Sequence, residues 1–281
     1  MSTLNCPEFN FYCNDDASYR ACIAYVKNVF DTVNPGLLSQ TEDTGQVDVA
    51  TVKYPASVSG AGSDYLIYRF DDGMGPPVFI RVNVYRGINV GRFICYVEIG
   101  HATNGAGVLS GNVYRFASYV SGASSNTQLP SFACCSPGQL SIAIGVKNSY
   151  PEFALHISRF CDDAGDPLNT GIFAAFSGGS SFVFISIVYN GGHLFVTNSE
   201  TAVRCDVFSR ASRLFGGEIV PDHVFCANPH TAPMATIAAV KKVDIGVGVE
   251  FDCAMVGARK RRFRNIGINM NSLDSFAVIW E

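Results

Sequence analysis

From about Val47 to Trp280, short runs of apolar, β-branched and aromatic residues alternate with clusters of Gly, Ser, Asn and Pro. The clearest runs are Val78–Tyr85 and Phe182–Tyr189. Such side chains pack well on a pleated, half-buried surface, and the intervening clusters have turn chemistry. The pattern predicts a mainly β fold, built as two β-sandwich-like or partly open barrel units with a short N-terminal helix.

The runs form two successive β regions. The glycine-bearing loops Arg86–Gly91 and Asn190–Gly192 are hairpin signals, so the strands flanking each loop should pair antiparallel. Both long hairpins contain Val-Phe-Ile, at Val78–Ile80 and Val183–Ile185, which suggests a duplicated unit as a hypothesis. The expected strands are Val47–Tyr54, Asp64–Phe70, Val78–Tyr85, Phe93–Ile99, Leu140–Val146, Phe153–Phe160, Gly171–Phe176, Ser181–Tyr189, His193–Asn198, Ala202–Phe208, Ala235–Val243, Ile245–Cys253 and Asp274–Trp280.

One helix is predicted, near the N-terminus. Asp15 or Asp16 can cap it, and Asn34-Pro35-Gly36 ends it. We expect the helix to cover an open sheet edge or to dock on a neighbouring subunit. Its apolar positions recur at three- and four-residue intervals, at Tyr19, Cys22, Ile23, Val26, Val29 and Phe30.

A boundary is expected after the first β region. Ser121–Thr127, followed by Pro130 and Pro137, has the composition of a linker. The predicted organisation is an N-terminal segment with the helix at 1–40, a first β domain at 45–122 and a second β domain at 138–281.

Composition points to contacts with other chains. Charged residues make up 16% of the 281 residues and apolar residues 48%, whereas soluble domains carry about 25% charged residues. There is no apolar run near the roughly 20 residues that a membrane span requires, so we expect oligomer or assembly contacts instead. The net charge of −4 gives no overall field for nucleic acid. The N-terminus lacks secretory-signal features, which favours cytoplasmic synthesis.

The ten cysteines follow no disulfide-framework spacing and form no Cys-x-x-Cys, so most are expected to be small buried thiols. A zinc site was considered at His223, Cys226 and His230 beside Asp222, with Cys205 or Cys253 as a distant fourth ligand. The alternative, a loop with a polar histidine and a buried cysteine, is preferred. We therefore predict no metal and no cofactor.

The other candidate motifs also have structural interpretations. Asp71-Asp72 and Asp162-Asp163 lack the spacing of a calcium loop, so they are interpreted as turn formers. Gly105–Gly111 lacks the spacing of a nucleotide-binding loop and is interpreted as a flexible β connection. Cys134-Cys135 lies in the expected linker, and a cysteine nucleophile would need a histidine placed by the fold. We predict that the chain is not an enzyme.

One basic cluster stands out, with five cations in the six residues from Arg259 to Arg264. On a strand, Arg262 and Arg264 would share a face with Lys260. An acidic patch on a neighbouring subunit, solvent or nucleic acid could satisfy these charges, and subunit contact is preferred. The predicted partner-contact residues are Arg259, Lys260, Arg261, Arg262 and Arg264.

Three stretches together resemble a pattern in uncharacterised virion structural proteins of tailed bacteriophages. They are Ser63–Gly73, Pro77–Val82 and Val97–Gly111, which give an aspartate-rich turn, a Pro-Val-Phe-Ile strand, and a strand ending in Gly before a Thr-Asn-Gly-Ala-Gly loop. The match covers roughly residues 60–111. The resemblance implies a tail-associated structural role at the tail tip, baseplate or fibre-attachment region. It carries no catalytic residues across.

The expected function is therefore that of a structural component of a tailed-phage virion, assembled in the host cytoplasm and located in the tail. Its expected partners are copies of itself and other tail or baseplate proteins, with no nucleic acid and no membrane span. The alternative is a host-surface or glycan-binding module, in which Tyr114, Phe116 or Tyr119 would be exposed on loops. For these three residues the preferred interpretation is that they are core strand residues. A cell-wall hydrolase is a third possibility and would need a catalytic pocket.

Overall fold

The computed structural model describes most of the chain. Its described residues are 1–56, 64–87, 91–110, 113–120, 127–146, 151–161, 166–178, 181–190, 193–197, 213–215, 218–220, 224–225, 234–235, 237–241, 248–254, 260–269 and 274–280. The fold is mainly β, with one helix near the N-terminus among the described residues, which confirms the predicted fold class. None of the sheets closes into a barrel within these residues.

The elements have the following bounds in chain order. They are β1 Ser2–Phe9, α1 Asp16–Val33, β2 Leu38–Gln40, β3 Asp64–Phe70, β4 Val78–Arg86, β5 Phe93–Gly100, β6 Ala102–Thr103, β7 Leu109–Ser110, β8 Tyr114–Val120, β9 Leu129–Ser136, β10 Gln139–Val146, β11 Pro151–Cys161, β12 Pro167–Gly178, β13 Ser181–Asn190, β14 His193–Thr197, β15 Arg213–Phe215, β16 Glu218–Val220, β17 Val224–Phe225, β18 Met234–Ala235, β19 Ile237–Lys241, β20 Glu250–Ala254, β21 Lys260–Asn269 and β22 Asp274–Ile279.

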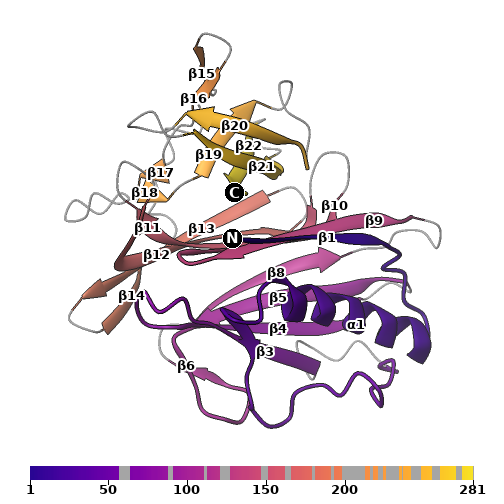
Figure 1. Ribbon diagram of the computed structural model, residues 1–281. Coiled ribbons are helices and arrows are strands. Elements are labelled where there is room, and N and C mark those ends of the chain that lie inside the picture. The colour runs from indigo at the N-terminus through magenta and orange to yellow at the C-terminus, as the bar shows by residue number, and fades with distance from the viewer. Residues whose placement is uncertain are drawn as a thin grey trace.

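Three sheets are stacked in layers, as Figure 1 shows. The lower layer, here called the N-terminal sheet, has the order β2-β3-β4-β5-β8. The middle layer, the central sheet, has the order β1-β9-β10-β11-β12-β13-β14, with β17 and β18 attached through β11. The upper layer, the C-terminal sheet, has the order β15-β16-β20-β21-β22-β19. A separate hairpin is formed by β6 and β7.

The helix lies between the N-terminal and central sheets and completes their shared core (Figure 1). Its apolar stripe, including Tyr19 and Phe30, is fully buried, and the Phe30 ring stacks on that of Tyr68 with centroids 4.8 Å apart. Asp15 caps the helix in a reciprocal capping box with Ser18. The predicted helix and its cap are therefore confirmed, and its apolar face packs into the core of this same chain.

Most predicted strands are present, and the two predicted hairpins pair antiparallel as β4–β5 and β13–β14. The strand predicted at Val47–Tyr54 is wrong. Asp48 makes a turn there instead, because its side chain accepts hydrogen bonds from the Ala50 N–H and the Thr51 hydroxyl. The predicted strand Ala202–Phe208 lies outside the described residues.

Several strands were not predicted, and the longest of them are β1, β8, β9 and β21. Pro130 and Cys134-Cys135 belong to β9 and not to a linker. Pro130 is tolerated there because the pairing of β9 with β1 shifts register at that point, and a bulge accommodates a residue without an N–H. Tyr114, Phe116 and Tyr119 lie on β8, so their placement on loops is wrong.

One continuous cluster of buried residues contains side chains from the N-terminal segment, the first β region and the strands β9 to β12. β1 pairs along β9, so the first residues of the chain belong to the central sheet. The predicted division at 1–40, 45–122 and 138–281 stays a prediction, as does the duplication. No helix among the described residues is long and apolar enough to cross a membrane.

Candidate functional site

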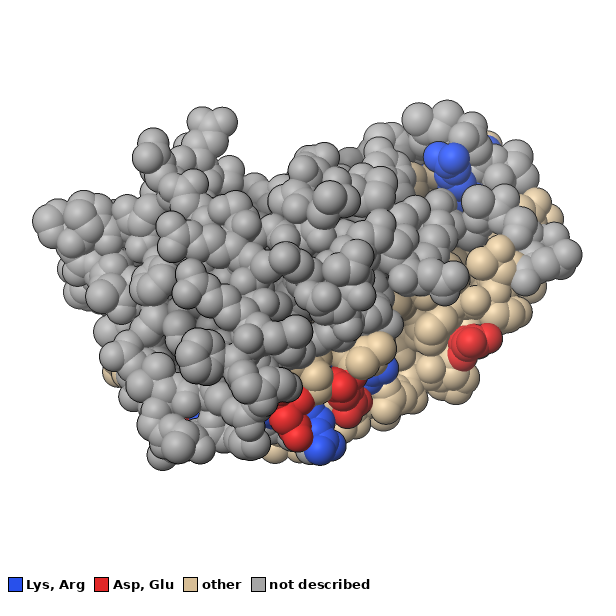
Figure 2. Space-filling view, turned by 90° about the horizontal axis from the view of Figure 1, so that it is seen from above, with Lys and Arg blue, Asp and Glu red and all other residues tan. Residues whose placement is uncertain are grey.

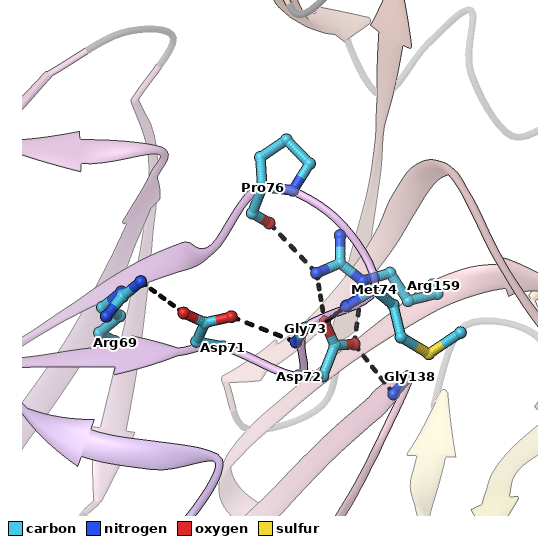
Figure 3. A network of polar contacts seen from close by, with 8 residues as sticks. All are labelled: Arg69, Asp71, Asp72, Gly73, Met74, Pro76, Gly138 and Arg159. Carbon is cyan, nitrogen blue, oxygen red and sulfur yellow. Dashed lines mark hydrogen bonds and ion pairs between the residues drawn. The ribbon is translucent and has the colours of Figure 1, made fainter.

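The best-defined polar site follows β3, where the chain turns at Asp71-Asp72-Gly73 (Figure 3). The Asp71 carboxylate accepts a hydrogen bond from the Gly73 N–H at 3.2 Å, and the Asp72 carboxylate accepts one from the Met74 N–H at 3.1 Å. Asp71 also forms an ion pair with Arg69. The interpretation of this acidic pair as turn formers is confirmed.

Asp72 does more than form the turn, because it makes a buried ion pair with Arg159 of β11 (Figure 3). The two contacts, from Nε and a terminal nitrogen of the guanidinium, measure 3.0 and 2.6 Å, and both side chains are 0% exposed. The Asp72 carboxylate also accepts the Gly138 N–H at 2.9 Å, and Arg159 donates to the Pro76 carbonyl at 3.1 Å. The pair thus joins the 71–77 loop to β11 and to the turn between β9 and β10.

The electrostatics fit a permanent ion pair. Burial raises the pKa of Asp72, but the hydrogen bonds and charge of Arg159 outweigh it, and the net pKa lies below its usual value. The carboxylate is therefore ionised at neutral pH and is not a proton donor. A cavity of about 50 Å³ beside Arg159 has room for ordered water but not for an organic substrate. The ion pair therefore links the N-terminal sheet to the central sheet.

A second polar group lies on the opposite face of the central sheet, where cross-strand pairing aligns Cys134, Ser141 and His156. The Ser141 hydroxyl lies 2.6 Å from Nδ1 of the fully buried His156. Burial raises the pKa of the Cys134 thiol to about 11 and lowers that of His156 to about 3. Gln139 donates to both Cys134 and the Ile279 carbonyl. At neutral pH this is an uncharged, hydrogen-bonded row that ties the central sheet to the C-terminal strand.

The described part of the basic cluster, from Lys260 to Arg264, lies on β21, so these residues are on a strand. Arg261 pairs with Asp166 at 3.1 Å, and Arg262 pairs with Asp252 at 3.3 Å on the neighbouring β20. Arg259 and the side chain of Lys260 lie outside the described residues. On the face shown in Figure 2, one group of acidic and basic side chains of the described part lies close together, while others stand apart. These two arginines are therefore partly neutralised within the chain.

Arg264 is an interior residue of the same strand, with a side chain that is 14% exposed. Its guanidinium lies over the rings of Phe132 and Trp280, 4.0 and 4.6 Å from their centroids. It donates to the side-chain oxygen of Asn5 at 2.6 Å and lies 3.7 Å from Glu250. Through these cation–π contacts and hydrogen bonds, Arg264 holds the C-terminal sheet against the central sheet.

The remaining candidate motifs are the glycine-rich segment, the cysteines and the possible zinc ligands. In the glycine-rich segment, residues 104–108 connect β6 to β7, and Gly111 lies outside the described residues. The Ala106 and Val108 N–H groups donate to the Asn104 side chain and hold this connection. The six cysteines that the structure describes are free and buried, as predicted for most. No metal-ligand group of three or more occurs among the described side chains. The considered zinc ligands Cys205, Asp222, His223, Cys226, His230 and the Cys253 side chain lie outside them, as do Asp162-Asp163.

Sequence reasoning singled out Asp72, Cys134 and Arg264 but missed the partners with which they form these sites. Nothing local marks Arg159 as the partner of Asp72, since 87 positions separate them. The Ser141–His156 contact could have been found from the expected pairing of two adjacent strands, had their register been derived. No family model, no curated protein and no solved structure matches the chain.

Proposed function

We propose that the chain is a structural component of a tailed-phage virion, joining tail tip, baseplate or fibre-attachment proteins through protein–protein contacts. The supporting observation is the buried Asp72–Arg159 pair, which braces the 71–77 loop against the central sheet. A braced three-layer body suits a part that must transmit force between neighbours without deforming.

The chemistry of the described polar groups supports the same proposal. Asp72 is held ionised by Arg159, while Cys134 and His156 are kept neutral by burial. Groups in these states hold elements together and are not poised for acid–base or nucleophilic work. Partner contacts then fall to exposed groups such as Arg262, whose side chain is 43% exposed. Rim charges of this kind set register and orientation.

The test is to locate the chain in particles. Antibodies raised against the recombinant chain should label purified virions at the tail, and peptides of the chain should appear in their mass spectra. In solution, light scattering at micromolar concentration should show a homo-oligomer or a complex with a tail protein from the same particle. Absence from purified virions, together with a stable monomer that binds no virion protein, would overturn the proposal.

A further inference from the structure

An open groove of about 580 Å³ lies on the N-terminal sheet, on the face away from the shared core. It is closer to an open surface hollow than to an enclosed pocket, so a ligand bound there would keep one side in solvent. One wall is the continuous segment 39–43, at and after β2, and the other side is formed by Arg69, Pro77 and Phe79. The groove borders the polar network of Figure 3, because Arg69 and the end of the 71–77 loop line it, but Asp72 and Arg159 are not among its lining residues.

The large apolar side chains that line the groove are Pro77 and Phe79. The Phe79 ring packs from behind on Tyr65, Ile67 and Leu109, a small cluster separate from the main core. Tyr65 is fixed in turn, because its hydroxyl donates to the Thr44 carbonyl at 2.8 Å and the Arg81 guanidinium lies over its ring. The exposed side of Phe79 is therefore a supported platform, able to take one face of a ring without rearranging.

The polar wall is held in place by Gln46. Its amide nitrogen donates to the carbonyls of Thr41 and Asp43, at 2.7 and 3.1 Å. Its side-chain oxygen accepts the Ile67 N–H at 2.8 Å and the Gln40 side-chain amide at 2.9 Å. Four hydrogen bonds from one side chain fix the wall before any ligand arrives. Such preorganisation reduces the entropy lost on binding.

The lining favours an uncharged ligand that is rich in hydroxyl groups. Gln40, Glu42, Asp43 and Arg69 all have planar polar ends that can bond two adjacent hydroxyls. Burial raises the pKa of Asp43, but the hydrogen bonds from Thr103 and other groups outweigh it, so the net pKa is below its usual value and the carboxylate is an acceptor. Arg69 is already paired with Asp71. The remaining acidic charge disfavours an anion.

A peptide strand fits less well, because adding a strand needs free backbone groups along the edge of β2. That edge is short, at Leu38–Gln40, and the Leu38 N–H already donates to the Asn34 carbonyl at 2.8 Å. A saccharide needs no such ladder. It needs one apolar platform and several planar hydrogen-bonding groups around it, which is the composition of this groove.

We propose that this groove binds a neutral oligosaccharide, with one sugar ring on Phe79 and its hydroxyls bonded to Gln40, Glu42 and Asp43. The experiment probes the purified chain on an array of defined neutral and anionic oligosaccharides, followed by calorimetric titration of the strongest neutral binder. Phe79→Ala should weaken binding by about tenfold or more, because the platform is lost. The matched control is Tyr85→Ala, which removes an aromatic ring from the same strand and face but outside the groove.

Glu42→Ala is a second variant, which removes one planar polar end, and its folding is not in question because Glu42 is exposed. It should weaken the same sugar several-fold with an unchanged thermal midpoint. Binding of no neutral oligosaccharide, binding of anionic ones alone, or equal loss in Phe79→Ala and Tyr85→Ala would overturn the proposal. The particle-labelling test of the assembly role uses a different readout, so either proposal can fail while the other stands.

Discussion

Replacing Arg159 by methionine tests whether the buried pair fastens the two sheets. The substitution keeps most of the apolar volume and removes the charge, which leaves the Asp72 carboxylate at 0% exposure with two backbone donors, Gly138 and Met74. Breaking a buried pair on one side costs about 3–5 kcal/mol. Domains are typically stable by about 5–15 kcal/mol, so Arg159→Met should remove a large fraction of the free energy of unfolding.

The matched control lies in the same turn. Arg69→Met removes the partner of Asp71, but those side chains are 47% and 35% exposed, so the cost should be about 1 kcal/mol or less. The double variant Asp72→Asn with Arg159→Met removes both charges. It should lose less than the sum of the two single variants, by about 0.5–3 kcal/mol of coupling.

Urea unfolding measures these differences, and the single tryptophan is a convenient probe. Trp280 is 2% exposed and contacts Phe132 across the interface between the central and C-terminal sheets. A loss for Arg159→Met no larger than that for Arg69→Met, or strict additivity in the double variant, would refute the reasoning. Since the pKa of Asp72 is lowered on folding, its contribution should be complete above the ordinary carboxyl pKa of 3.8 and disappear as the pH falls below that value.

Three further predictions follow from single contacts. Burial lowers the pKa of His156 to about 3, so between pH 6.5 and pH 3 a proton binds to this histidine in the unfolded chain and not in the folded one. The free energy of unfolding should therefore fall by about 2 kcal/mol between pH 7 and pH 5, measured by urea unfolding. If His156→Gln does not reduce this pH dependence, the prediction is contradicted. Asp15→Ala removes the cap of α1 and should cost about 1 kcal/mol in thermal or urea unfolding, whereas no measurable loss would count against the cap. Gly107→Ala should destabilise the chain more than Gly105→Ala, because both have positive φ but only Gly107 would push its Cβ into the Tyr65 ring; equal melting temperatures would refute that packing.

Elements that are determined by neighbouring residues could be predicted from the sequence. The spacing of Tyr19 to Phe30 and the cap at Asp15 are properties of neighbouring residues, and α1 appears where they predict it. The same holds for the long strands β4 and β13 with their glycine turns. The failure at Val47–Tyr54 is also local, because the Asp48 side chain bonds its own backbone and outweighs the apolar pattern.

The sites could not be predicted, because the residues that form each of them lie far apart in the sequence. β1 has an irregular pattern of polar and apolar residues, and it is a strand because β9 offers it a ladder of partners. Arg159 looks like any charge in a strand until the 71–77 loop lies beside it. The basic cluster was recognised as unusual, yet the aromatic partners of Arg264 come from β9 and from the C-terminal end of the chain.

The low charge content predicts that other chains cover this one, and this stays a prediction. In the described part, apolar residues fill a core shared between layers, and the exposed large hydrophobic side chains are Met1, Val108, Val113, Leu168 and Val249, from separate segments. An assembly contact made by the described surface would therefore have a polar rim. Arg262 and Asp252, whose side chains are 43% and 62% exposed, form an ion pair of the kind that such a rim would contain. Because exposed charges are screened by salt, such a contact should weaken as ionic strength rises. If a complex of the chain with a tail protein stays assembled in 1 M salt, the contact cannot depend on these exposed charges and must lie on another part of the surface.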